Sequence, residues 1–98
     1  MFEATAPEAT ARKHLEVTIV DTDNGNVLRI QGEPETLVSA VVDEMYEQLR
    51  KSRQEGDRLW CTANGDSVLA HLTERLEAYR STHCSALRWS FASESGGA

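Results

Sequence analysis

Hydrophobic and polar residues alternate in two neighbouring stretches of the N-terminal half. From Leu15 to Ile19 every second residue is apolar, which is the period of a β-strand with one buried face. A second alternating run covers residues 27–31. Between the two runs stands Asn24-Gly25, the dipeptide typical of a tight hairpin turn in which both residues adopt positive φ. The pattern predicts two antiparallel strands joined by this turn.

Two later segments carry apolar residues at helical spacing. The first follows Pro34, a residue suited to a first helical position, and its apolar stripe runs from Leu37 to Leu49. The second begins near Asp66 or Ser67, which are suitable N-caps, and extends to about residue 82. Each helix has a single apolar stripe, so each is predicted to cover one surface and to expose the rest.

Residues 58–63 and 86–91 alternate again and predict a third and a fourth strand. The resulting order, ββαβαβ, predicts an α/β (α+β) two-layer sandwich. Because the strands are apolar on one side only, both helices should lie on one face of a four-stranded mixed sheet. Strands joined through a helix should be parallel neighbours or near neighbours. We expect a single domain over residues 14–92, with a mobile N-terminal tail at 1–13 and a flexible C-terminal tail at 93–98.

The uncovered face of the sheet is the most informative prediction. Alternation places three arginines, one tryptophan and two valines there with a single carboxylate, that of Glu16. The candidate interaction residues are Trp60, Arg29, Arg58, Arg88, Val20 and Val27. They allow three interpretations: a solvated surface on which arginine stems shield the tryptophan, an interface for a protein partner or a second copy, or a platform for single-stranded nucleic acid.

The overall charge bears on that choice. The 98 residues include 16 acidic and 10 basic side chains, for a formal net charge of −6. A negative chain repels phosphate backbones, so nucleic acid is the least favoured partner. The acidic excess lies mainly on the predicted helix faces, the hairpin loop and the N-terminal tail, whereas the open face carries three arginines against Glu16 alone, so a protein partner with an acidic surface is favoured. We expect a small non-enzymatic protein-interaction or self-association domain, a homodimer being one form. No apolar run is long enough to span a membrane.

The remaining chemistry predicts little. The sequence begins without the pattern of an export signal, so we expect a cytoplasmic protein in which Cys61 and Cys84 are reduced thiols. These cysteines and the histidines His71 and His83 show no C-x-x-C or H-x-x-x-H spacing, so no metal and no cofactor is expected. No nucleophile, base and orienting group converge, which predicts no catalytic residue. A small regulatory ligand at the loop that precedes the second helix is an alternative.

One family comparison arises from two motifs. The Asn24-Gly25 hairpin followed directly by a long amphipathic helix, and the C-terminal Ser95-Gly96-Gly97-Ala98, resemble the opening and the end of a ubiquitin-like β-grasp protein. The resemblance implies a modifier function, for which Ala98 would have to be removed to free the carboxylate of Gly97. The second helix departs from that family's pattern. A ubiquitin-like modifier is therefore a further alternative function.

Overall fold

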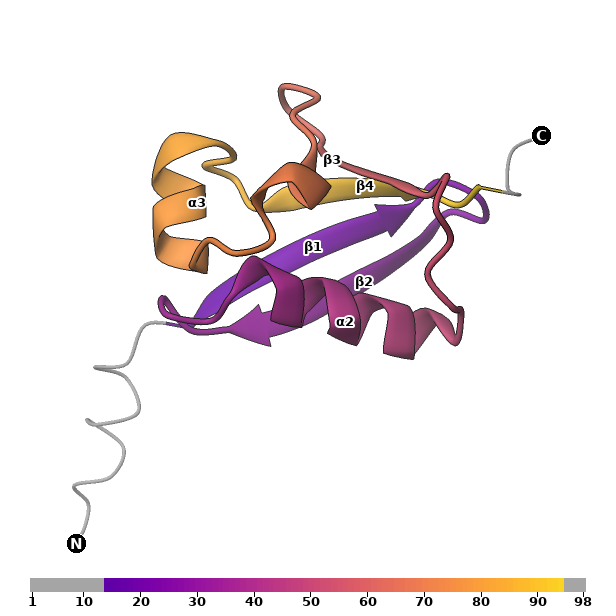
Figure 1. Cartoon of the computed structure of the whole chain (residues 1–98), viewed down its shortest axis with the longest axis horizontal. Helices are drawn as coiled ribbons and strands as arrows, with labels where there is room; N and C mark the ends of the chain where they lie inside the picture. Colours follow the sequence, from indigo (N-terminus) through magenta and orange to yellow (C-terminus); the bar gives the residue numbers. More distant parts are fainter. Residues whose placement is uncertain (1–13, 95–98) are drawn as a thin grey trace, which may run out of the picture.

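A computed structural model describes residues 14–94 and contains four strands, two α-helices and one 3₁₀-helix (Figure 1). In chain order these are β1 (Leu15–Asp21), β2 (Asn26–Gly32), α2 (Val38–Leu49), β3 (Arg58–Cys61), η1 (Val68–His71, the 3₁₀-helix), α3 (Leu76–Thr82) and β4 (Arg88–Ala92). The sheet is mixed, and the helices lie on one side of it. The predicted α+β class, element order and four-stranded mixed sheet are confirmed.

The strands lie in the order β2-β1-β4-β3. The central strands β1 and β4 are parallel to each other. At one edge β2 pairs antiparallel with β1, and at the other edge β3 pairs antiparallel with β4. The prediction of parallel neighbours or near neighbours across each helix holds only in part. β2 and β3 run in the same direction but are not neighbours, and β3 and β4 are neighbours but antiparallel. The α2 connection spans the whole sheet, because β2 and β3 are opposite edge strands. The η1 and α3 connection joins antiparallel neighbours, because the chain passes through α3 at one end of the sheet and returns along β4 in the opposite direction (Figure 1).

The hairpin between β1 and β2 is wider than the predicted two-residue turn. Asp21 pairs with Asn26, so four residues form the loop, and of these only Gly25 has a positive φ, of 81°. The Gly25 N–H donates to the Asp21 carbonyl at 2.7 Å. Side chains support the loop locally, since the Asp21 carboxylate accepts from the Asp23 N–H and the Asn24 side chain accepts from the Asn26 N–H. These acceptors favour the longer turn.

The second predicted helix is divided. Residues 72–75 separate η1 from α3, because their backbone carbonyls bond to the first residues of α2. The Val38 N–H donates to the Glu74 carbonyl at 2.8 Å, and the Ser39 N–H donates to the Leu72 carbonyl at 3.0 Å. These bonds satisfy N–H groups at the start of α2, which has no side-chain cap. The first helix accordingly begins at Val38, four residues after the predicted Pro34.

The core lies between the sheet and the helices. The inward-facing residues of the four strands are buried as predicted, apart from Leu28, which is partly buried at the edge. Trp89 on β4 is the largest fully buried side chain, and it meets Tyr79 of α3 edge to face at 5.8 Å. Phe91 meets Tyr46 of α2 in the same way at 5.7 Å. These contacts attach both helices to β4.

Cys61 and Cys84 form a disulfide, so the prediction of two reduced thiols is wrong. Cys61 ends β3, and Cys84 follows α3; their Cα atoms lie 5.9 Å apart, within the range that a disulfide can bridge. The two positions are 23 residues apart in the sequence, and only the return of the chain through α3 brings them together. The bond therefore ties the end of α3 to an edge strand.

Asp57, which precedes β3, is a buried carboxylate with three hydrogen-bond donors. It accepts from the Tyr46 hydroxyl at 2.7 Å and from the N–H groups of Gln54 and Glu94 at 2.9 and 2.7 Å. Burial by itself raises the pKa of Asp57, but these hydrogen bonds and the Lys51 charge outweigh burial and hold the pKa below its usual range. The ionised form is thus favoured in the folded state.

We expect Asp57→Asn to lower the free energy of unfolding by about 2 kcal/mol at neutral pH. Because the folded pKa lies below the unfolded value of about 3.9, the wild-type advantage is present above that value. It should be lost as the pH falls from about 4 through the folded pKa. Urea unfolding at a series of pH values measures the difference in free energy between wild type and Asp57→Asn. The control is Asp43→Asn, at an exposed position of α2. A constant difference between wild type and Asp57→Asn across this range would contradict the assignment.

Candidate functional site on the open sheet face

The sheet face opposite the helices carries all six interaction residues predicted from the sequence. Strand pairing sets two of them beside Thr18 of the central strand β1: Arg29 on one side, from β2, and Arg88 on the other, from β4. Both arginines are exposed, and Thr18 is half-buried. The arrangement presents two guanidinium groups from strands that flank β1.

A second row lies across the same face. Val20 of β1 pairs with Val27 on β2 and with Ser90 on β4, and Ser90 in turn pairs with Trp60 on the edge strand β3. Val27 is 47% exposed, one of two large hydrophobic side chains at such exposure among residues 14–94. Trp60 and Val20 are half-buried. The row is therefore apolar at both ends and polar at Ser90.

Arg58 and Trp60 form a pair at the β3 edge. The Arg58 guanidinium carbon lies 5.5 Å from the centre of the Trp60 ring, within the range of a cation–π contact. Next to them is a depression of about 280 Å³, lined in part by Gly65, Ser67 and Leu69. A side chain of a binding partner could enter this depression while it contacts the Trp60 ring.

The open face is electrostatically unbalanced. Within residues 14–94 no ion pair engages Arg29, Arg58 or Arg88. Glu16 is the single acidic strand residue on this face, and its carboxylate accepts a hydrogen bond from the Gln31 amide at 3.0 Å. Among residues 14–94 no carboxylate therefore neutralises the three guanidinium charges.

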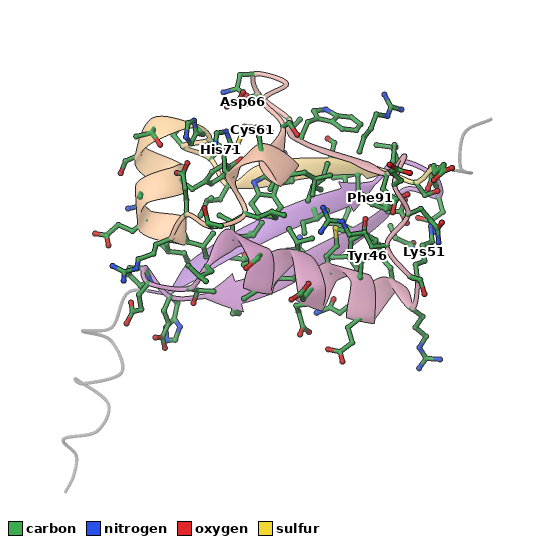
Figure 2. The ribbon with its side chains drawn as sticks, viewed as in Figure 1. Tyr46, Lys51, Cys61, Asp66, His71 and Phe91 are labelled. Carbon is green, nitrogen blue, oxygen red and sulfur yellow. A yellow bond between two sulfur atoms is a disulfide. The ribbon has the colours of Figure 1, made fainter. Side chains whose placement is uncertain are left out.

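A second cluster was missed by sequence reasoning. Asp66, His71 and His83 each place a potential metal-ligand atom within 4.8 Å of the others, with Glu74 beside both imidazoles. Figure 2 shows Asp66 and His71 with Cys61 at the end of the molecule away from Tyr46 and Lys51. The residues come from the loop after β3, from η1 and from the end of α3. No sequence motif marks them, because the chain reversal through α3 brings them together.

The comparisons with known proteins support the fold alone. No protein-family model and no curated protein matches the chain. A solved structure of a protein designed de novo on the basis of ubiquitin is similar, with a TM-score of 0.59 and 21% sequence identity over 86% of this chain and 93% of that one. This similarity agrees with the β-grasp resemblance of the hairpin and first helix. Residues 95–98, on which the predicted modifier function depends, lie outside the described residues, as does the predicted tail at 1–13.

No helix in the described part of the chain has the length and apolar character needed to cross a bilayer.

Proposed function

We propose that the protein is a non-enzymatic interaction domain whose open sheet face binds an acidic surface of another polypeptide. The observation that carries the proposal is the pairing of exposed Arg29 and Arg88 across β1 on a face whose strands contribute one carboxylate. Arginine forms paired hydrogen bonds with carboxylates and is, with tryptophan, enriched at the energetic centres of protein interfaces.

The geometry of the face supports a polypeptide partner. Trp60 is the one aromatic side chain of the strands on this face, whereas single-strand nucleic-acid platforms stack successive bases on several rings. The chain's net charge of −6 adds long-range repulsion toward a phosphate backbone. An acidic polypeptide also meets that repulsion, but its carboxylates can engage the arginines while its side chains fill the depression beside Trp60.

Charge reversal tests the proposal. A short oligo-glutamate peptide should perturb backbone NMR signals of β1, β2 and β4, and added salt should weaken the effect. Arg29→Glu or Arg88→Glu should reduce the peptide affinity at least about tenfold, because like charges then oppose each other. Arg80→Glu on exposed α3 is the matched control and should leave the affinity within about twofold. Perturbations confined to other surfaces, or equal losses in all three variants, would refute the proposal.

Trp60→Ala separates the remaining alternatives. For a polypeptide interface centred on Trp60 we expect a loss of at least about tenfold in affinity, the size of a hot-spot effect. Sedimentation of the free protein reports whether a second copy occupies the face, and titration with oligothymidylate reports on nucleic acid. Tighter binding of the oligonucleotide than of the acidic peptide, or a dimer broken by Trp60→Ala, would replace the proposed partner class.

The cytoplasmic location expected from the sequence stays a prediction, and the disulfide argues against it. Persistent disulfides are rare in compartments kept reducing by glutathione and thioredoxin. Thiol alkylation of the protein in its host cells, followed by intact-mass analysis, decides the question: a fully alkylated Cys61 and Cys84 pair indicates a reducing compartment.

A further inference from the structure

Two stacked imidazoles form the centre of a second site, which shares no residue with the open face. The rings of His71 and His83 are 3.7 Å apart and inclined by 20°. Glu74 lies on one side, with one carboxylate oxygen 3.1 Å from His71 Nδ1 and 3.3 Å from His83 Nε2. Asp66 lies on the other side, 3.6 Å from His71 Nε2 and 3.5 Å from His83 Nδ1. In each ring, one nitrogen therefore faces the Glu74 carboxylate and the other faces the Asp66 carboxylate.

A neutral imidazole has one N–H group and one lone pair. If the nitrogens that face Glu74 carry the hydrogens, then His71 Nε2 and His83 Nδ1 both direct lone pairs toward the Asp66 carboxylate. Three electron-pair donors would then converge with no hydrogen between them, an arrangement that a cation stabilises. A carboxylate that orients the distal nitrogen of a ligating histidine is the usual support of a protein zinc site.

We propose that His71 Nε2, His83 Nδ1 and Asp66 Oδ2 bind one Zn²⁺ ion, with solvent in the fourth position and Glu74 as the positioning residue. Bonds of about 2.0–2.1 Å in tetrahedral geometry separate ligand atoms by about 3.4 Å. The separations of 3.5 and 3.6 Å from Asp66 Oδ2 to the two nitrogens are close to that value. Imidazole and carboxylate are ordinary zinc ligands, and three protein ligands leave the ion open to solvent.

The fold brings the ligand residues close together before any ion binds. The disulfide from Cys61 to Cys84 joins the loop that carries Asp66 to the residue after His83. Asn64 adds a second link, because its side chain donates to the His83 carbonyl at 2.7 Å and accepts from the Asp66 N–H at 2.8 Å. These links keep the three ligand residues close together. Because rings stacked 3.7 Å apart direct their lone pairs along nearly parallel lines, one imidazole has to rotate about its side-chain bonds before both nitrogens bind the same ion.

Tyr79 supports the cluster from the core. Its fully buried ring lies 5.7 Å from His71 and 5.6 Å from His83 between ring centres. The carboxylates of Asp66 and Glu74 lie close enough to act on its hydroxyl electrostatically. The hydroxyl makes no hydrogen bond of good geometry within residues 14–94. It is a buried polar group close to two carboxylates whose charge Zn²⁺ would offset.

Calorimetric titration of the untagged, oxidised full chain with Zn²⁺ tests the site. We expect one ion per chain and a loss in affinity of at least about tenfold in His71→Ala, His83→Ala and Asp66→Asn. Glu74→Gln should weaken binding by about 10- to 100-fold without removing a ligand. The matched control is His14→Ala, which changes the remaining histidine of the chain, exposed ahead of β1, and should bind as wild type does.

A measurement on the wild-type chain keeps the proposal falsifiable if a variant does not fold. Added Zn²⁺ should shift the imidazole ring signals of His71 and His83 in the NMR spectrum and leave those of His14 in place. Absence of saturable Zn²⁺ binding, equal affinity in wild type and the His71→Ala and His83→Ala variants, or shifts confined to His14 would each overturn the assignment.

Discussion

Reducing the Cys61–Cys84 disulfide should lower the free energy of unfolding of the wild-type chain by about 3 kcal/mol. The bond closes a segment whose ends are 23 positions apart, and its loss returns conformational freedom to the unfolded chain. A loss of this size is a large fraction of the roughly 5–15 kcal/mol that stabilises a domain. Urea unfolding with and without a phosphine reductant measures the difference on an unchanged sequence.

The double variant Cys61→Ala/Cys84→Ala is the control for this experiment. Both cysteines are buried, so the variant also loses some packing, but its unfolding curve should not respond to reductant. Intact mass verifies the redox state of each wild-type sample. Superimposable curves for the oxidised and reduced wild type would show that the cross-link contributes no stability.

The division of the sheet into two faces could be predicted from the sequence because it depends on a local period. Alternation fixes which side of a strand a residue occupies, whatever the neighbouring strand is. Alternation within residues 86–91 places Trp89 and Phe91 on the side opposite Arg88, whatever the strand order, and the structure buries both rings and exposes the arginine. The proposed interaction site rests on this local information.

Features that depend on the path of the chain could not be predicted in the same way. The apolar stripe from Val68 to Tyr79 suits one helix, but backbone bonds to residues 36–39 divide it into η1 and α3. Because the segment is divided, α3 leads the chain back toward β3, and β4 then runs antiparallel to that strand. The disulfide and the cluster of Asp66 with the two histidines both depend on this turn, so their residue spacing carried no signal.

The two tryptophans of the chain provide a direct test of the two faces, since the same substitution can be made on each. Trp89→Ala should lower the free energy of unfolding by about 3–5 kcal/mol, because the fully buried ring leaves a cavity against Tyr79. Trp60→Ala should cost about 1 kcal/mol or less, because this ring is half-buried and its partner is the exposed Arg58.

Urea unfolding followed by far-UV circular dichroism compares the variants fairly, since each one removes one of two tryptophan fluorophores. A Trp89→Ala chain that is already unfolded without urea agrees with the expectation, provided that Trp60→Ala stays folded. Equal losses in the two variants would mean that Trp60 belongs to the core and would leave no exposed aromatic centre for an interface. If only Trp89→Ala lowers the free energy of unfolding strongly, the helix-covered face of the sheet supplies the packing that stabilises the fold. The other face is then available for binding.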